Sequence, residues 1–153
     1  DLHLSIRRQR QMCIRDRGDS VQIPKVTPFL MFNNEAEEAI ELYTSVFEDS
    51  EVVSMVKYDE FGSGEAGAVQ HAIIRLKDQI IMAIDNSNGT EIPMNPSISL
   101  FVTVDNAMEM ERLYSGLKSG GAILMAKTEL GPYREFAWIQ DRFGVNFQLA
   151  LMD

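Results

Sequence analysis

Near its end the chain reads Asp141-Arg142-Phe143-Gly144-Val145-Asn146-Phe147-Gln148-Leu149, and this stretch closes the second of two similar halves. Each half contains a Leu-Tyr pair within a predicted helix. The first pair begins at Leu42, and the second begins 71 residues later at Leu113. An apolar strand precedes the helix in each half, and three strand-like stretches follow it. A repeat of this length predicts two copies of one supersecondary unit.

The first twenty residues do not belong to the repeat. They contain five arginines, show neither helical nor strand periodicity, and in part resemble translated sequencing-adaptor read-through. We interpret residues 1–20 as a non-native or disordered leader, and a native basic arm for an acidic partner is the alternative. Residues 21–153 are predicted to form one domain, with a first module at 23–85, a linker at 86–96 and a second module at 97–152.

Composition narrows the functional classes. The formal net charge is −9, and it becomes −11 without the leader, which holds five of the 14 basic and three of the 23 acidic residues. So acidic a chain would repel nucleic-acid phosphates. No apolar run approaches the roughly 20 residues that span a bilayer. Cys13 is the only cysteine and lies in the leader. We expect a soluble cytoplasmic protein that binds neither nucleic acid nor membrane.

Local patterns predict the elements of both halves. Asn34 and Glu37 have the spacing of a capping box, which predicts a helix starting near Glu35, and Asn106 with Glu109 repeats that spacing. A mobile loop is expected at 62–67 because it is rich in glycine. Strands are predicted at 26–32, 52–58, 69–76 and 80–84 in the first half, and at 98–104, 123–127, 135–140 and 145–151 in the second.

Three motifs carry a resemblance to a known family. They are Thr27-Pro28-Phe29-Leu30-Met31-Phe32, Leu42-Tyr43-Thr44-Ser45-Val46-Phe47, and the closing stretch extended back to Phe136-Ala137-Trp138-Ile139-Gln140. With them, residues 23–152 resemble the PhnB-like branch of the vicinal oxygen chelate superfamily, which includes glyoxalase I, extradiol dioxygenases and bleomycin-resistance proteins. The resemblance implies an α+β fold in which two tandem βαβββ modules form a cupped mixed sheet around a cleft, commonly in a homodimer.

The metal positions of that superfamily are altered in this chain. Its metal-using members hold a divalent ion with histidines and glutamates from the first and last strands of the modules. The resemblance places three of these positions at or beside Pro28, at Ser99 and at Gln148, and the fourth near Met82. Outside the leader, His71 is the only histidine. A His-rich iron or zinc site therefore cannot be built within one chain, and we expect neither metal nor cofactor.

The remaining aromatic and polar side chains indicate a ligand site. Phe136 and Trp138 alternate along one strand, so they share a face with Arg134. Aromatic rings supply contact area, and an arginine can meet an anion. Core packing explains the aromatic residues equally well, and a surface position explains Arg134. The predicted ligand-binding set is His71, Trp138, Phe136, Gln148, Arg134, Phe29 and Met82.

Three functions stay open. The first is metal-independent binding of a small organic molecule in an apolar, aromatic-lined cleft. The second is a superfamily lyase, isomerase or oxygenase whose atypical metal site uses His71, Gln148 and a carboxylate such as Asp85. The third is a dimeric interaction module without a ligand. Some PhnB-like relatives carry a demethylubiquinone methyltransferase label, but the sequence has no methyl-donor motif, and we assign no catalytic residue.

Overall fold

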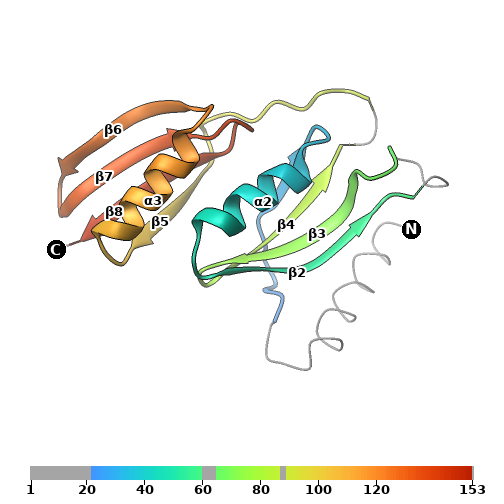
Figure 1. Cartoon of the computed structure of the whole chain (residues 1–153), viewed down its shortest axis with the longest axis horizontal. Coiled ribbons are helices and arrows are strands. Elements are labelled where there is room, and N and C mark those ends of the chain that lie inside the picture. The colour runs from blue at the N-terminus through green and yellow to red at the C-terminus, as the bar shows by residue number, and fades with distance from the viewer. Residues whose placement is uncertain (1–21, 60–64, 87–88, 153) are drawn as a thin grey trace. The chain divides into compact units, whose positions relative to one another are not determined.

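The computed structural model describes residues 22–59, 65–86 and 89–152 (Figure 1). The predicted leader lies outside the described residues, and so do residues 62–64, the first half of the predicted loop at 62–67. The chain divides into two compact units, before and after the bond between Ile92 and Pro93. Within the described part, no helix is long and apolar enough to cross a membrane.

The first unit holds one βαβββ module. Its elements are β1 (Phe29–Phe32), α2 (Ala36–Val46), β2 (Ser50–Lys57), β3 (Val69–Leu76) and β4 (Gln79–Asp85). The four strands form one sheet in the order β1-β4-β3-β2. β1 and β4 run parallel, and the other neighbours are antiparallel.

The second unit repeats this plan. Its elements are β5 (Ser99–Val104), α3 (Ala107–Lys118), β6 (Ala122–Leu130), β7 (Tyr133–Gln140) and β8 (Asn146–Met152). The sheet order is β5-β8-β7-β6, again with a parallel first and last strand. The predicted α+β fold of two tandem βαβββ modules with mixed sheets is confirmed.

Each helix covers one face of its own sheet, and we call the opposite face the helix-free face. In the first module, α2 buries Ile40 and Tyr43, and Ile81 of β4 is buried on the same side. Strand side chains alternate between the two faces. The helix-free face of this sheet carries an apolar cluster against which the partly buried Ile23 packs, made of Val53, Ile73, Ile80 and Met82.

The start of α2 differs from the prediction. The helix begins at Ala36, the Glu35 side chain makes no capping bond, and Asn34 has a left-handed φ of 64°. Glu37 forms an ion pair with Lys57 of β2 instead of reaching back along the helix. The predicted capping box at Asn34 is therefore wrong.

Asp85, at the end of β4, supplies the missing cap. Its Oδ1 accepts a hydrogen bond from the Ala36 N–H at 2.9 Å, and its Oδ2 accepts one from the Val69 N–H at 2.8 Å. A carboxylate is also favourable at this end of the helix because the helix dipole is positive there. The buried Asp85 carboxylate thus fixes α2 to β3 and β4.

The predicted capping box of the second module is confirmed. Asn106 Oδ1 accepts from the Glu109 N–H at 2.9 Å, and Glu109 Oε1 accepts from the Asp105 N–H at 2.6 Å. Helix α3 therefore begins with a local cap, whereas α2 relies on a distant strand.

The closing stretch forms the turn between β7 and β8. Asp141 is buried, and its Oδ1 accepts hydrogen bonds from the N–H groups of Phe143 and Val145, each at 2.9 Å. Gly144 has a φ of 92°, a backbone conformation that glycine adopts without strain. The Asp and the Gly of this signature are thus explained by the turn.

Strand β6 is one of the two edge strands of the second sheet, and it is longer than the predicted 123–127. All nine of its residues are exposed, including Ile123, Leu124 and Met125. An exposed edge strand presents unpaired backbone groups that can pair with another chain.

Candidate ligand-binding site

A row of four side chains crosses the helix-free face of the second sheet. Gln148 of β8 lies opposite Phe101 of β5 and opposite Trp138 of β7, and Trp138 lies opposite Met125 of β6. Residues in register on neighbouring strands project to the same face. We call these four residues the Gln148 row.

Gln148 forms a polar pair with Ser99. Its Nε2 donates a hydrogen bond to Ser99 Oγ at 2.8 Å, and both side chains are partly buried. Among the described residues, this bond leaves Gln148 Oε1 as an acceptor and the Ser99 hydroxyl hydrogen as a donor. The pair therefore presents one acceptor and one donor side by side.

The indole ring of Trp138 is held in place. Its Nε1–H donates to Asn146 Oδ1 at 3.1 Å, and the Asn146 amide donates to the Gly144 carbonyl oxygen at 3.2 Å. Asn146 is only 1% exposed. A buried side chain with both ends bonded orients the ring that it contacts.

Three further rings lie beside the row. The centroids of Tyr133 and Phe136 are 6.0 Å apart with stacked planes, and Phe101 lies 6.0 Å from Tyr133 and 6.4 Å from Phe136. A shift in register between Tyr133 and Glu135 places Tyr133 opposite Met152 of β8, whose side chain shares the face of Gln148. We call Phe101, Tyr133 and Phe136 the ring cluster. Phe136 is buried, and Phe101 is 51% exposed.

The predicted residues of the first module lie in a more apolar setting. Met82 of β4 lies opposite Phe29 of β1 and opposite Ile73 of β3. These three residues form the counterpart of the Gln148 row in the first module. Met82 is only 3% exposed and belongs to the cluster that Ile23 contacts. His71 is also buried, two positions before Ile73 on the same face.

The structure groups the predicted residues by module. Trp138, Phe136 and Gln148 lie together on the helix-free face of the second sheet. Arg134 is exposed at the start of β7. Phe29, Met82 and His71 form the corresponding group of the first module. Binding by any of the seven stays a prediction.

The alternative metal site of the sequence analysis is not supported within the first module. Ala72 pairs with Ala83 on the helix side of the sheet, so Asp85 faces the helix and His71 faces away from it. Both Asp85 oxygens already accept backbone hydrogen bonds. Among the described residues, no group of three or more His, Cys, Asp or Glu residues could hold a metal ion.

Sequence reasoning missed several parts of the site. Phe101 corresponds to Phe29 of the first module, since each lies opposite the central residue of its row, so a strand-by-strand alignment of the two halves could have found it. The position of Tyr133 beside Phe136 depends on a register shift in β7 that no sequence pattern indicates. No local signal marks Asn146 as the partner of Trp138.

Two βαβββ modules with mixed sheets define the glyoxalase/bleomycin resistance/dioxygenase superfamily. A domain described by those names from Frankia sp. EAN1pec shares the fold, with a TM-score of 0.60 and 16% identity over 88% of this chain and 100% of its own. Residues 24–150 match the family described as 3-demethylubiquinone-9 3-methyltransferase. The chain belongs to this PhnB-like family, and its fold is that of the superfamily.

One solved relative carries the description of this family, and another is similar in sequence. A PhnB protein from Bacillus cereus, described as a proposed 3-demethylubiquinone-9 3-methyltransferase, is 41% identical over 84% of this chain and 99% of its own, with a TM-score of 0.79. A protein from Staphylococcus aureus is 56% identical over 87% of this chain and 100% of its own, with a TM-score of 0.37. No curated protein matches the chain.

Proposed function

We propose that the protein binds a small organic molecule, without a metal, on the helix-free face of its second sheet. The observation that carries the proposal is the hydrogen bond between Gln148 and Ser99, with Gln148 flanked by Trp138 and Phe101 on the neighbouring strands. Ligand sites typically combine aromatic surface with a few placed polar groups. This face has both.

The chemistry of the Gln148 and Ser99 side chains supports binding without a metal. The resemblance implies that Gln148 and Ser99 occupy two metal-ligand positions of the superfamily, and in this structure the two side chains bond to each other. A neutral amide and a hydroxyl are weak ligands for transition metals, which prefer imidazole, thiolate or carboxylate. Binding a small molecule does not require stronger ligands.

The description of the family suggests methyl transfer. Such a reaction needs a site for a methyl donor in addition to the site for its acceptor. Gln148, Ser99 and the surrounding rings provide one polar pair and aromatic surface, and the sequence has no methyl-donor motif. These features support binding of one small molecule in preference to methyl transfer.

Nuclear magnetic resonance of the full-length chain tests the proposal. Trp138 is the only tryptophan, so the labelled protein has a single indole N–H resonance. We expect members of a library of small aromatic and aliphatic molecules to shift this resonance saturably, and S-adenosylmethionine to leave it unchanged. The methyl resonance of Ala137, whose side chain is buried on the helix side of β7, is the control. If no library member shifts the indole signal, the proposal is wrong.

Metal independence has its own test. Elemental analysis of the purified protein, followed by titration with iron, zinc, manganese and nickel in a thermal melt, should show neither stoichiometric metal nor stabilisation. Stoichiometric metal that is lost in His71→Ala would contradict the proposal. It would favour the atypical metal enzyme instead.

We also propose a homodimer. Its support is the edge strand β6, whose nine residues are all exposed and include several large apolar side chains. Edge strands of this kind pair readily with another chain.

A further inference from the structure

We infer that the ligand is a neutral, planar ring carrying a hydrogen-bond donor beside an acceptor, as an aromatic primary carboxamide does. The inference rests on the proposed function and names the class of ligand that the same site takes. Three properties of the site support it: its lack of charge, its polar pair and its rings.

The site is uncharged. Ser99, the Gln148 row and the ring cluster contain no side chain that is charged near neutral pH. Transfer of an ion from water to such a surface is unfavourable unless a counter-charge is present. Arg134 is the only cation in β7, and it lies at the exposed start of the strand, where water and salt screen its charge. The net charge of −9 disfavours anions further.

The polar pair is complementary to a carboxamide. Gln148 Oε1 can accept from the ligand N–H, and the Ser99 hydroxyl can donate to the ligand carbonyl. If the Gln148 amide is turned the other way, the Ser99 hydroxyl donates to Gln148 Oε1. Gln148 Nε2 is then available as a donor and Ser99 Oγ as an acceptor. Either arrangement presents one donor and one acceptor.

The rings favour a flat molecule. Trp138 and Phe101 lie on either side of Gln148 in the row, and Trp138 is fixed through Asn146. Aromatic rings gain stacking energy from a flat partner in addition to the area that they bury. A planar ligand whose polar group meets Gln148 can contact these rings at the same time.

The first module serves as an internal reference. The positions of Phe101, Gln148 and Trp138 are there held by Phe29, Met82 and Ile73. Met82 and Ile73 are buried in an apolar cluster that the chain's own Ile23 contacts. The fold therefore does not require a polar residue at the centre of the row. The polar pair and the indole ring belong to the second module alone.

Three probes separate charge, shape and polarity. 2-Naphthamide is planar and neutral with a donor and an acceptor, 2-naphthoate is planar and anionic, and cyclohexanecarboxamide is neutral but not planar. We expect 2-naphthamide to shift the Trp138 indole and Gln148 side-chain amide resonances saturably. The other two should bind at least about tenfold more weakly, a difference of about 1.4 kcal/mol.

Two variants test the polar pair. Gln148→Met introduces the residue that the first module carries and should weaken 2-naphthamide binding about tenfold, as should Ser99→Ala. Thr103→Val, on the same face of β5 outside the row, is the matched control and should bind as the parent does. Thermal melting of each variant shows whether it has folded.

The outcomes distinguish the inference from the proposed function. If 2-naphthoate binds as tightly as 2-naphthamide, or if both pair variants bind as the parent does, the inference is wrong while binding on this face stands. If no probe shifts the indole resonance, the inference is also wrong, and the library measurement then decides the proposed function.

Discussion

Asp85 connects the start of α2 to the start of β3 through one buried carboxylate. Asp85→Ala leaves the N–H groups of Ala36 and Val69 without their acceptor in a buried setting. We expect this change to lower the free energy of unfolding by about 2–4 kcal/mol, measured by urea denaturation.

The matched control is Asp78→Ala. Asp78 is exposed in the turn between β3 and β4, so its loss should change the free energy of unfolding by less than about 0.5 kcal/mol. Equal stability of the Asp85 and Asp78 variants would contradict the role of Asp85 as a cap.

The candidate site was predictable only in part. Gln148 could be predicted because the family resemblance places it at a metal-ligand position, and Trp138 because strand residues alternate. The resemblance also pointed to Ser99, but only as an altered metal position and not as a ligand-binding residue. The bond between Asn146 and Trp138 joins residues eight positions apart across a turn, and no periodicity indicates it. Ring contacts of Tyr133 depend on a register shift in β7, which the sequence pattern does not show.

The two helices differ in where their caps come from, and this difference can be measured. Asn106→Ala removes the side-chain acceptor for the Glu109 N–H and should lower the free energy of unfolding by about 1 kcal/mol. Asn34→Gly should change it by less than about 0.5 kcal/mol, because Asn34 makes no such cap and glycine accepts its positive φ. Urea denaturation gives both values, and a larger loss for Asn34→Gly would contradict this assignment.

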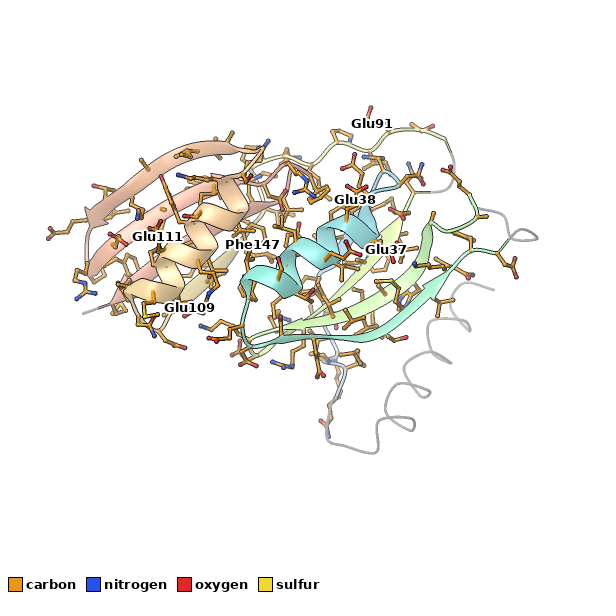
Figure 2. The ribbon with its side chains drawn as sticks, viewed as in Figure 1. Glu37, Glu38, Glu91, Glu109, Glu111 and Phe147 are labelled. Atoms are coloured by element: carbon orange, nitrogen blue, oxygen red, sulfur yellow. The ribbon has the colours of Figure 1, made fainter. Side chains whose placement is uncertain are left out.

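An ion pair joins α3 to β6. Lys127 Nζ lies 2.7 Å from Glu111 Oε2, and Ser115 donates to Glu111 Oε1 at 2.8 Å (Figure 2 labels Glu111 on α3). The pKa of Glu111 lies below its ordinary value. The hydrogen bond from Lys127 is the largest cause, and the hydrogen bond from Ser115 is the second. The bond between Lys127 and Glu111 also raises the pKa of Lys127.

Titration of Glu111 tests this pair. Its lowered pKa means that its contribution to stability is present above the ordinary carboxyl range and is lost as the pH falls through the lowered pKa. The contribution of Lys127 is present below its ordinary range and is lost as the pH rises through its raised pKa. Lys127→Met should raise the pKa of Glu111. A pH titration of the Glu111 carboxyl carbon by nuclear magnetic resonance measures this pKa. The control Lys118→Met should raise it less, because Lys118 acts on Glu111 only through its charge.

The existence and order of the elements followed from local patterns, whereas some of their ends did not. Apolar stretches predicted every described strand, and the box at Asn106 predicted the start of α3. The cap of α2 could not be read locally, because Asp85 lies 49 residues from Ala36. The exposed extension of β6 to Leu130 was missed because polar residues there end the apolar pattern.

For the whole molecule, we expect a homodimer. Light scattering after size-exclusion chromatography should give about twice the mass of one 17.3 kDa chain. Leu124→Lys places a charge on the exposed edge strand and should shift the protein toward the monomer. Lys127→Arg keeps the charge of the strand and is the control. A monomer for the parent protein would contradict the expectation.

Each module pairs its first strand with its last, and this sets an order of completion during synthesis. The first sheet can close once Asp85 has left the ribosome, because β4 then reaches both β1 and β3. The second sheet lacks its centre until β8 is made, since β8 lies between β5 and β7. A chain that stops after β7 and before β8 therefore carries a finished first sheet together with strands β5 and β7, whose shared partner β8 is missing. Unpaired edges of this kind promote aggregation.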